Sequence, residues 1–355
     1  MEVNLVIKTE KSTKLIDWLW KSKFSISALS LLISLIVLVV MSLLYGANPK
    51  QVLISLFQGA LGSRKSIIFT LLQTAPLILT GLAVLLPYKA GFFNVGGQGQ
   101  LEIGAIAAIF VATNYHSHIP IVIIVASLLA SMVGGIIAVL IPLFLKVKHE
   151  VNEVTTTIMM NYICINLVYA MITGVMKDPK AFYGTTRVVP EVFRLPEFLG
   201  VHVGVWLAVV IALITSWFVK YLVWGMKLKA VGINRVAALT VGISCNKILI
   251  DSVIFAAAIA GLAGGIQVLG VTYRFAEGCE LPWGFSGICI AFLGGNPLGV
   301  IPVAFILAIL ETGSRYMQSM TGVPSAMVNI MQGIPVLLFL YLNVWLAPKL
   351  KSKIK

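Results

Sequence analysis

Long apolar runs follow one another through most of this sequence, and they constrain its fold more than any other feature. Residues 24–45 form the first run, and a helix of this length extends about 33 Å, enough to cross a hydrocarbon core of about 30 Å. Because a signal-peptide core has only about 7–15 apolar residues, we expect this run to remain as an uncleaved span. Ten runs are predicted to span the membrane: 24–45, 66–87, 93–112, 119–145, 154–175, 203–224, 248–272, 284–293, 298–312 and 325–347.

The eighth and ninth runs are short and are interrupted by glycine and proline. We expect broken or re-entrant helices there, which a membrane tolerates only where protein or a polar cavity surrounds the backbone. A weak internal repeat relates residues 91–108 to residues 287–304, since both are glycine-rich, carry amides and lead into a helix of small residues. Such segments in two halves point to a site at the repeat interface, and chance similarity is the alternative. The predicted fold class is an all-α polytopic membrane bundle of about ten helices with an internal repeat.

Composition and charge also indicate a membrane protein. Of the 355 residues, 59% are hydrophobic and 11% charged, whereas soluble proteins have about 25% charged residues. The net charge of +13 comes from basic residues between the apolar runs and at both ends, which indicates topology-setting charge and not nucleic-acid binding. Of the 26 lysines and arginines, 17 fall on the N-terminal side of ten spans, so both termini are predicted to be cytoplasmic. The predicted organisation is a basic tail (1–23), a transmembrane domain (24–347) with a long cytoplasmic loop (225–247), and a second basic tail (348–355).

Motifs for catalysis and cofactor binding are absent from the sequence. No segment matches G-x-x-x-x-G-K-[ST], so the chain is not expected to bind ATP in a P-loop. No H-E-x-x-H or G-x-S-x-G motif occurs, and the four cysteines form no C-x-x-C pair. The sequence therefore predicts a protein that is not an enzyme and holds neither a metal nor a cofactor.

A few polar residues lie inside the predicted spans, and they are the candidates for a path for a polar solute. A charged side chain at a helix centre costs about 2.5–3.5 kcal/mol on insertion scales, so such residues usually face a bundle interior or a cavity. Asn94, Gln98 and Glu102 are spaced i, i+4, i+8, which would align them on one face if the region is helical. Two interpretations remain open: a polar strip along a translocation path, or hydrogen bonds that only hold helices together. The candidates are Asn94, Gln98, Gln100, Glu102 and Asn161.

The loop 225–247 differs from a plain connector because small residues alternate with lysine and arginine. Asn234 is placed to cap a short helix, Ala237 and Ala238 favour helix, and Gly242 can end it. Small side chains allow close approach to a partner and the charges set orientation, so we expect a docking helix. The candidate coupling residues are Gly225, Ala230, Gly232, Asn234, Arg235, Ala237, Ala238 and Gly242.

Three segments in order carry a resemblance to a known family: 88–105 (YKAGFFNVGGQGQLEIGA), 152–162 (NEVTTTIMMNY) and 225–243 (GMKLKAVGINRVAALTVGI). They resemble the permeases of bacterial ABC importers for nucleosides and simple sugars, a family that includes the branched-chain amino acid permeases. The resemblance covers about residues 30–345, and segment 88–105 looks closest to the nucleoside branch.

The resemblance implies a transport subunit of the bacterial cytoplasmic membrane that moves a small polar solute, a nucleoside first and a simple sugar next. It implies a second, similar permease, cytoplasmic ATPase subunits that bind the ATP, and an extracellular binding protein, often a lipoprotein. Segment 225–243 matches the family's coupling segment. The alternatives are an ion- or proton-coupled secondary transporter that uses Glu102, and a structural or assembly subunit of the membrane. The coupling-like loop discriminates, because a secondary transporter has no ATPase to dock.

Overall fold

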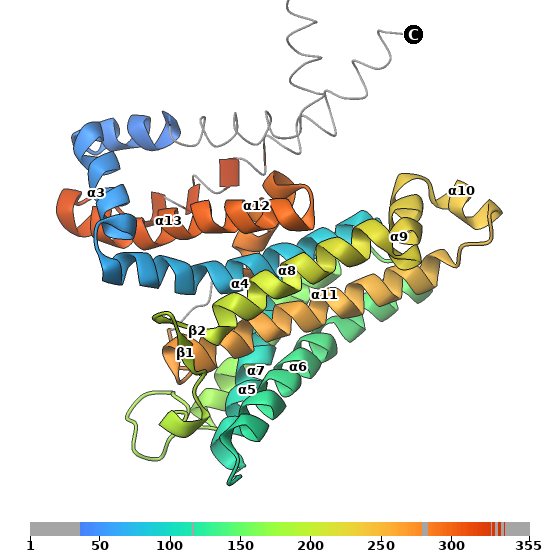
Figure 1. Cartoon of the computed structure of the whole chain (residues 1–355), viewed down its shortest axis with the longest axis horizontal. Coiled ribbons are helices and arrows are strands. Elements are labelled where there is room, and N and C mark those ends of the chain that lie inside the picture. The colour runs from blue at the N-terminus through green and yellow to red at the C-terminus, as the bar shows by residue number, and fades with distance from the viewer. Residues whose placement is uncertain are drawn as a thin grey trace, which may run out of the picture.

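A computed structural model describes residues 36–115, 117–278, 283–327, 329–330, 333–334 and 337. The predicted tails, most of the first predicted span and most of the tenth lie outside the described residues. Helices make up almost the whole described chain (Figure 1). They are α3 (Pro49–Leu61), α4 (Arg64–Lys89), α5 (Gly97–Asn114), α6 (Pro120–His149), α7 (Glu153–Thr173), α8 (Val203–Tyr221), α9 (Val223–Ile233), α10 (Arg235–Thr240), α11 (Cys245–Gln267), α12 (Trp283–Gly294) and α13 (Pro297–Thr321).

Six of the described helices are long and apolar enough to cross a membrane: α4, α6, α7, α8, α11 and α13. A seventh span results if the helix Ile36–Leu44 and α3 are counted together, although the pair is bent by 120°. The predicted all-α membrane bundle is therefore confirmed, and the predicted count of ten spans is higher than the six or seven found. Helices α5 and α12 stand where spans were predicted, but α12 has only 12 residues.

Glycine contacts bring α5, α6 and α11 together at the centre of the bundle. Gly104 on α5 lies against the backbone of Gly261 on α11, and Gly135 on α6 lies against Ala257 and Gly261 of the same helix. A Cβ atom at any of these glycines would overlap the neighbouring backbone, so only glycine permits this spacing. Small residues are the usual means of close helix contact in membranes, where burial from water supplies no driving force.

Two helices differ from the sequence-based expectation. The ninth predicted span, 298–312, is not broken: α13 is one helix of 25 residues that continues through Glu311. Asn296 caps it by accepting a hydrogen bond from the amide of Gly299, and Pro297 occupies its first turn, where a missing N–H costs little. Helix α3 was not predicted at all; Asn48 and Pro49 begin it in the same way.

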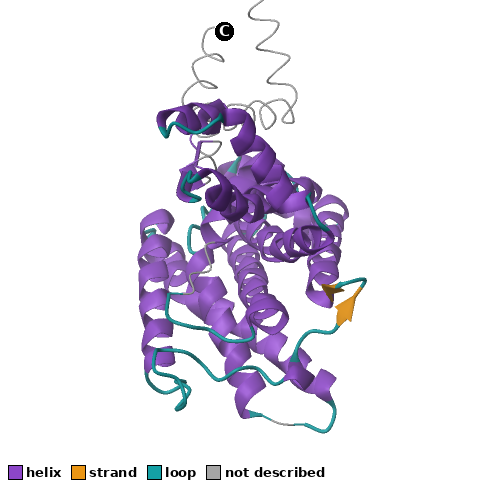
Figure 2. Cartoon of the chain, turned by 90° about the vertical axis from the view of Figure 1, so that its left-hand side faces the viewer, coloured by secondary structure: helices purple, strands orange, loops and turns teal. Residues whose placement is uncertain are grey.

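The segment between α7 and α8 forms a cover over one end of the bundle (Figure 2). It contains a 3-10 turn (Glu191–Phe193) and a small hairpin of β1 (Glu197–Phe198) and β2 (Val201–His202). Both turn residues of the hairpin have positive φ, as two-residue hairpin turns require. Backbone hydrogen bonds tie this segment to residues 268–278, which begin with the π-helix η2 (Val268–Thr272): Thr186 donates to Phe275, and Leu195 donates to Leu269.

Candidate functional site

The predicted polar strip divides into two parts, because helix α5 begins after Asn94, whereas the predicted alignment required helix from Asn94 onward. Asn94 precedes α5, which starts at Gly97, so Asn94 does not share a face with Gln98 and Glu102. Its side-chain oxygen accepts from the amide of Gly96 at 3.0 Å, a local turn that competes with helix. The expectation of three aligned residues is therefore wrong for Asn94.

Asn94, Gln100 and Asn161 form an inner amide cluster that joins the start of α5 to α7. Asn94 and Gln100 exchange two side-chain hydrogen bonds, of 3.1 and 3.2 Å. Asn161 accepts from the amide of Gly99 at 2.9 Å and donates to the carbonyl of Val95 at 2.9 Å. All three side chains are buried. These bonds satisfy backbone groups that the glycine-rich entry to α5 leaves open, so this half of the strip holds helices together.

Gln98 and Glu102 form the second part, on the next face of α5. Gln98 donates to Glu102 at 2.7 Å, and its side-chain oxygen accepts from the amide of Gly284 at the start of α12, at 3.1 Å. Glu102 is only 5% exposed, yet it lines a cavity of about 160 Å³. This carboxylate therefore faces the bundle interior with a polar neighbour.

The cavity beside Glu102 lies between α5, α7 and the end of segment 268–278. Its polar groups are Glu102, Tyr169 and Glu277, and Phe275 contributes an aromatic ring. The Tyr169 hydroxyl donates to the Glu277 carboxylate at 2.9 Å, which links α7 to segment 268–278. Two carboxylates and two aromatic rings suit a solute that carries hydroxyl or N–H donors and a flat face.

A polar stripe on α7, which the sequence interpretation missed, continues from this cavity along the outside of the chain. Tyr162, Asn166, Tyr169 and Thr173 follow i, i+4, i+7, i+11 spacing and are all exposed. Asn166 and Thr173 each donate to a carbonyl of their own helix, which lowers the cost of exposure to lipid. The spacing is visible in the sequence, but apolar residues lie between these positions, so the sequence interpretation treated residues 154–175 as one apolar span without a polar face.

A second carboxylate that the sequence interpretation passed over is Glu311 on α13. It accepts from the indole N–H of Trp283 at 3.1 Å and from the Ser286 hydroxyl at 3.2 Å, both on α12. Glu311 therefore holds the short helix α12 against α13. This structural role is enough to explain why a carboxylate lies here, without a role in a translocation path.

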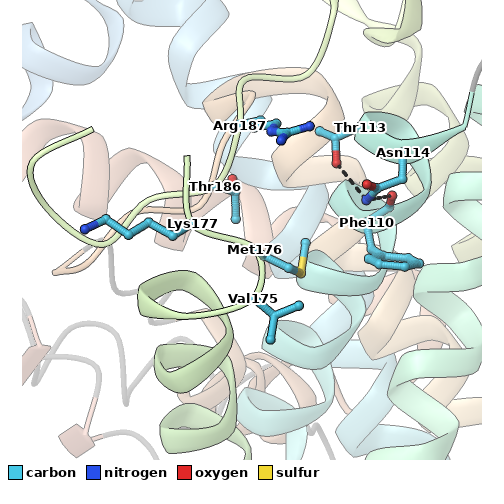
Figure 3. Close-up of a pocket in the computed structure, with 8 residues that line it drawn as sticks. All are labelled: Phe110, Thr113, Asn114, Val175, Met176, Lys177, Thr186 and Arg187. Atoms are coloured by element: carbon cyan, nitrogen blue, oxygen red, sulfur yellow. Dashed lines mark hydrogen bonds between the residues drawn. The ribbon is translucent and has the colours of Figure 1, made fainter. Parts of the chain in front are cut away.

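A further small cavity, of about 140 Å³, lies beneath the cover at the end of α5 and α7 (Figure 3). Its lining includes Thr113 and Asn114 of α5 and Lys177 and Arg187 of the cover. In Figure 3, Arg187 lies near Thr113, whereas the Lys177 side chain extends away from the other labelled residues. The two basic groups therefore do not converge on one ligand position.

The predicted docking segment folds as two helices, α9 and α10, which project from the opposite end of the bundle (Figure 1). Asn234 caps α10 by accepting from the amide of Ala237 at 3.1 Å, and Gly242 follows with a φ of 79°. Arg235 donates to Asn246 at 2.6 Å, which ties α10 to the start of α11. Among the other candidates, Gly225, Ala230 and Gly232 lie on α9, and Ala238 is the buried residue of α10.

Helix α10 exposes apolar side chains outside the bundle. Val236 is 71% and Leu239 55% exposed, and Ile233 precedes them at 86%. Gly232 lies against the end of α4 instead, because a Cβ there would meet the carbonyl of Lys89. An exposed apolar helix on a short stalk is typical of a surface that a partner protein covers.

A helical bundle with a buried polar interior and an exposed helix at one end is the architecture of a polytopic membrane subunit. The chain belongs to the family described as "Branched-chain amino acid transport system / permease component", whose model matches residues 66–340. It is 33% identical over 313 residues to a guanosine ABC transporter permease of Bacillus subtilis, covering 84% of this chain and 88% of that protein. It is 32% identical to a nucleoside ABC transporter permease of Lactococcus lactis, over 82% of this chain and 83% of the relative. A glucose ABC transporter permease of Haloferax volcanii is 31% identical, over 80% of this chain and 78% of the relative.

Proposed function

We propose that this chain is the permease subunit of an ATP-driven importer that carries a nucleoside across the bacterial cytoplasmic membrane, with a simple sugar as the second substrate class. The observation that carries the proposal is its likeness, over more than four fifths of its length, to the permeases named for guanosine and nucleosides. The likeness to a permease named for glucose is the reason that a simple sugar is the second substrate class. No cofactor is part of this chain in the proposal, and the ATP is bound by partner subunits.

The translocation path runs, in this proposal, along the cavity at Glu102 and the α7 stripe, and a second permease subunit faces that stripe. Exposed polar side chains on a membrane helix favour a protein or water neighbour over acyl chains. The cavity of about 160 Å³ is smaller than the roughly 300 Å³ at which small-molecule sites begin, so α7 has to move for a nucleoside to pass. Asn94, Gln100 and Asn161 anchor the path, and Gln98 and Glu102 contact the solute.

Helix α10 docks into the cytoplasmic ATPase and transmits its closure to α9 and α11. A stiff, capped helix supports this role, because a flexible linker would absorb the motion. We expect Ala237→Trp, at an exposed position, to abolish ATPase co-purification and transport while membrane expression stays normal. Gly232→Trp would be a poorer test, because it would also disturb the contact with Lys89. Normal binding and transport in Ala237→Trp would refute the coupling role.

Both termini and α10 are cytoplasmic in this proposal, and the cover faces outward, where an extracellular binding protein delivers the solute. The excess of basic residues on the α10 side supports this orientation. Phe182 in the cover and Leu239 in α10 are both exposed. In a variant without native cysteines, Phe182→Cys should react with an impermeant maleimide in intact cells and Leu239→Cys should not. The reverse pattern would overturn the orientation.

The decisive experiment is uptake by proteoliposomes that contain this chain with its ATPase, second permease and binding protein. We expect guanosine uptake that requires ATP inside, is competed by other nucleosides, and is unaffected by glucose. Glucose uptake in place of guanosine uptake would move the substrate to the sugar class. Uptake by this chain alone, driven by a proton gradient without ATP, would replace the proposal with the secondary transporter.

A further inference from the structure

A groove between α6 and α11 opens on the outer surface of the bundle, away from the candidate path. It has a volume of about 480 Å³. Apart from one lysine, its lining is entirely aliphatic or aromatic: Leu140, Leu143, Phe144, Val147, Ile250 and Ile254, with Lys148. Packed side chains of Val139, Leu249 and Val253 form a core cluster with Leu143 beneath it. The groove is therefore a formed depression with a solid floor.

The groove lies between two membrane-spanning helices, at the end of the bundle where α9 and α10 lie. Figure 1 shows α6 and α11 side by side there, and the contacts of Gly135 with Ala257 and of Ser131 with Gly265 fix them as an antiparallel pair. From Leu140 to Lys148 the helix rises about 12 Å, close to the roughly 15 Å of hydrocarbon in one leaflet. A groove of this length and lining matches an acyl chain that reaches from the membrane surface toward the midplane.

A free cation marks the surface end of the groove. The Lys148 ammonium lies 5.5 Å from the centre of the Phe144 ring, so its stem follows the apolar lining while its charge stays at the surface. Lys146 on the same turn is neutralised by Glu153 at 2.7 Å, but no ion pair forms at Lys148 within the described part of the chain. Glu150, two residues further along the chain, and Asp251 on α11 form no ion pair with it either. Lys247, in the first turn of α11, adds a second basic residue at this end.

We propose that this groove binds one anionic phospholipid, with an acyl chain along Leu143, Ile250 and Ile254 and its phosphate at Lys148. The occupant is a lipid because the lining is apolar along the membrane normal and the single charge lies where headgroups lie. Its headgroup is anionic because a zwitterionic one would bring a positive charge toward a lysine that has no carboxylate partner. In the proposed orientation the site belongs to the cytoplasmic leaflet, where basic residues between helices recognise anionic headgroups.

The test is native mass spectrometry of the purified full-length chain after delipidation, with phosphatidylglycerol or phosphatidylcholine of identical acyl chains added back. We expect about fivefold preference for phosphatidylglycerol, the ratio that one lysine near a membrane surface provides. Lys148→Gln should abolish the preference. The matched control is Lys220→Gln, since Lys220 also lies over an aromatic ring, at 4.9 Å from Tyr221, but does not line this groove.

A second variant tests the contribution of the apolar groove to lipid binding separately from that of the Lys148 charge. Ile254→Trp should fill the groove and remove the tight binding of either lipid, whereas Phe255→Trp, at the neighbouring exposed position, should leave binding unchanged. Equal binding of the two lipids by the natural chain would overturn the proposal. So would undiminished phosphatidylglycerol binding in both Lys148→Gln and Ile254→Trp, or a partner subunit that protects Ile254→Cys from a lipid-borne label in the assembled transporter.

Discussion

The polar interior has two ends, the inner amide cluster and an outer end that comprises Glu102, its cavity and the residues beside segment 268–278. The two ends differ in the hydrogen bonds that their buried groups form. At the inner end, the buried amides form hydrogen bonds with one another and with backbone groups: Asn94 bonds to Gln100, and Asn161 bonds to the backbone of Gly99 and Val95. At the outer end, Glu102 borders a cavity, and both ring nitrogens of the buried His202 have no hydrogen-bond partner among the residues that the structure describes. A saturated network stabilises one packing, whereas a polar group that borders a cavity leaves room for a solute or a second arrangement. We therefore expect mutations at the inner end to affect folding and mutations near Glu102 to affect transport.

The largest effect is expected for Asn161→Leu at the inner end. The substitution leaves the amide of Gly99 and the carbonyl of Val95 buried without partners, which costs about 1–3 kcal/mol for each group. Expression and thermal midpoint in detergent should both fall sharply. Asn166→Leu on the exposed face of the same helix is the control and should fold normally. A normal midpoint for Asn161→Leu would remove the structural role of the inner cluster.

His202 should make the outer end sensitive to acid. It lies in β2, outside the membrane-crossing helices, and burial lowers the pKa of its imidazole to about 4, against an ordinary value near 6.5. As pH falls through 6.5 the unfolded chain binds this proton first, so stability is full above pH 6.5 and declines toward pH 4, by roughly 3 kcal/mol in total.

The measurement for His202 is the thermal midpoint in detergent between pH 7.5 and pH 4.5. His202→Leu keeps the packing against Gly204 and Gly270 but does not titrate. The variant should lose much less stability than the natural chain over this range. Parallel curves for the two proteins would show that acid acts elsewhere.

Glu102→Gln should separate transport from folding. An amide still accepts the hydrogen bond from Gln98, so the midpoint should change little. Loss of the charge weakens bonds to the solute by about 1 kcal/mol, so uptake should fall roughly fivefold to tenfold. ATP-driven uptake at the natural rate in this variant would remove Glu102 from the path.

The smallest effect is expected for Tyr169→Phe. It removes the hydrogen bond to Glu277 at an exposed position, so stability should stay within about 0.5 kcal/mol of the natural chain. Uptake should fall less than in Glu102→Gln, because Glu277 remains free to bind solute. A larger loss of uptake than in Glu102→Gln would place the narrow part of the path between α7 and segment 268–278.

The sequence was sufficient to predict a structural feature where a residue type has one typical role in its local structure, such as capping a helix. Asn234 predicted the start of α10, and the structure caps that helix with the same side chain. Glycines in a membrane helix favour close packing, and the structure places Gly261, Gly264 and Gly265 of α11 against α5 or α6. The interruption predicted near Pro302 was wrong, because a proline early in a helix loses one bond that packing against α3 and α4 outweighs.

By itself the sequence determined that this chain is an all-α membrane protein, since apolar length and charge placement depend only on the order of residues. It also determined the family, through motifs that the comparisons bear out. Only the tertiary structure decided how the polar residues divide: Asn94 pairs with Gln100, and Glu102 borders a cavity shared with α7 and segment 268–278. The physical reason is that a buried polar group takes whichever partner the packing brings within about 3 Å, and residues far apart in sequence, such as Gly99 and Asn161, supply those partners.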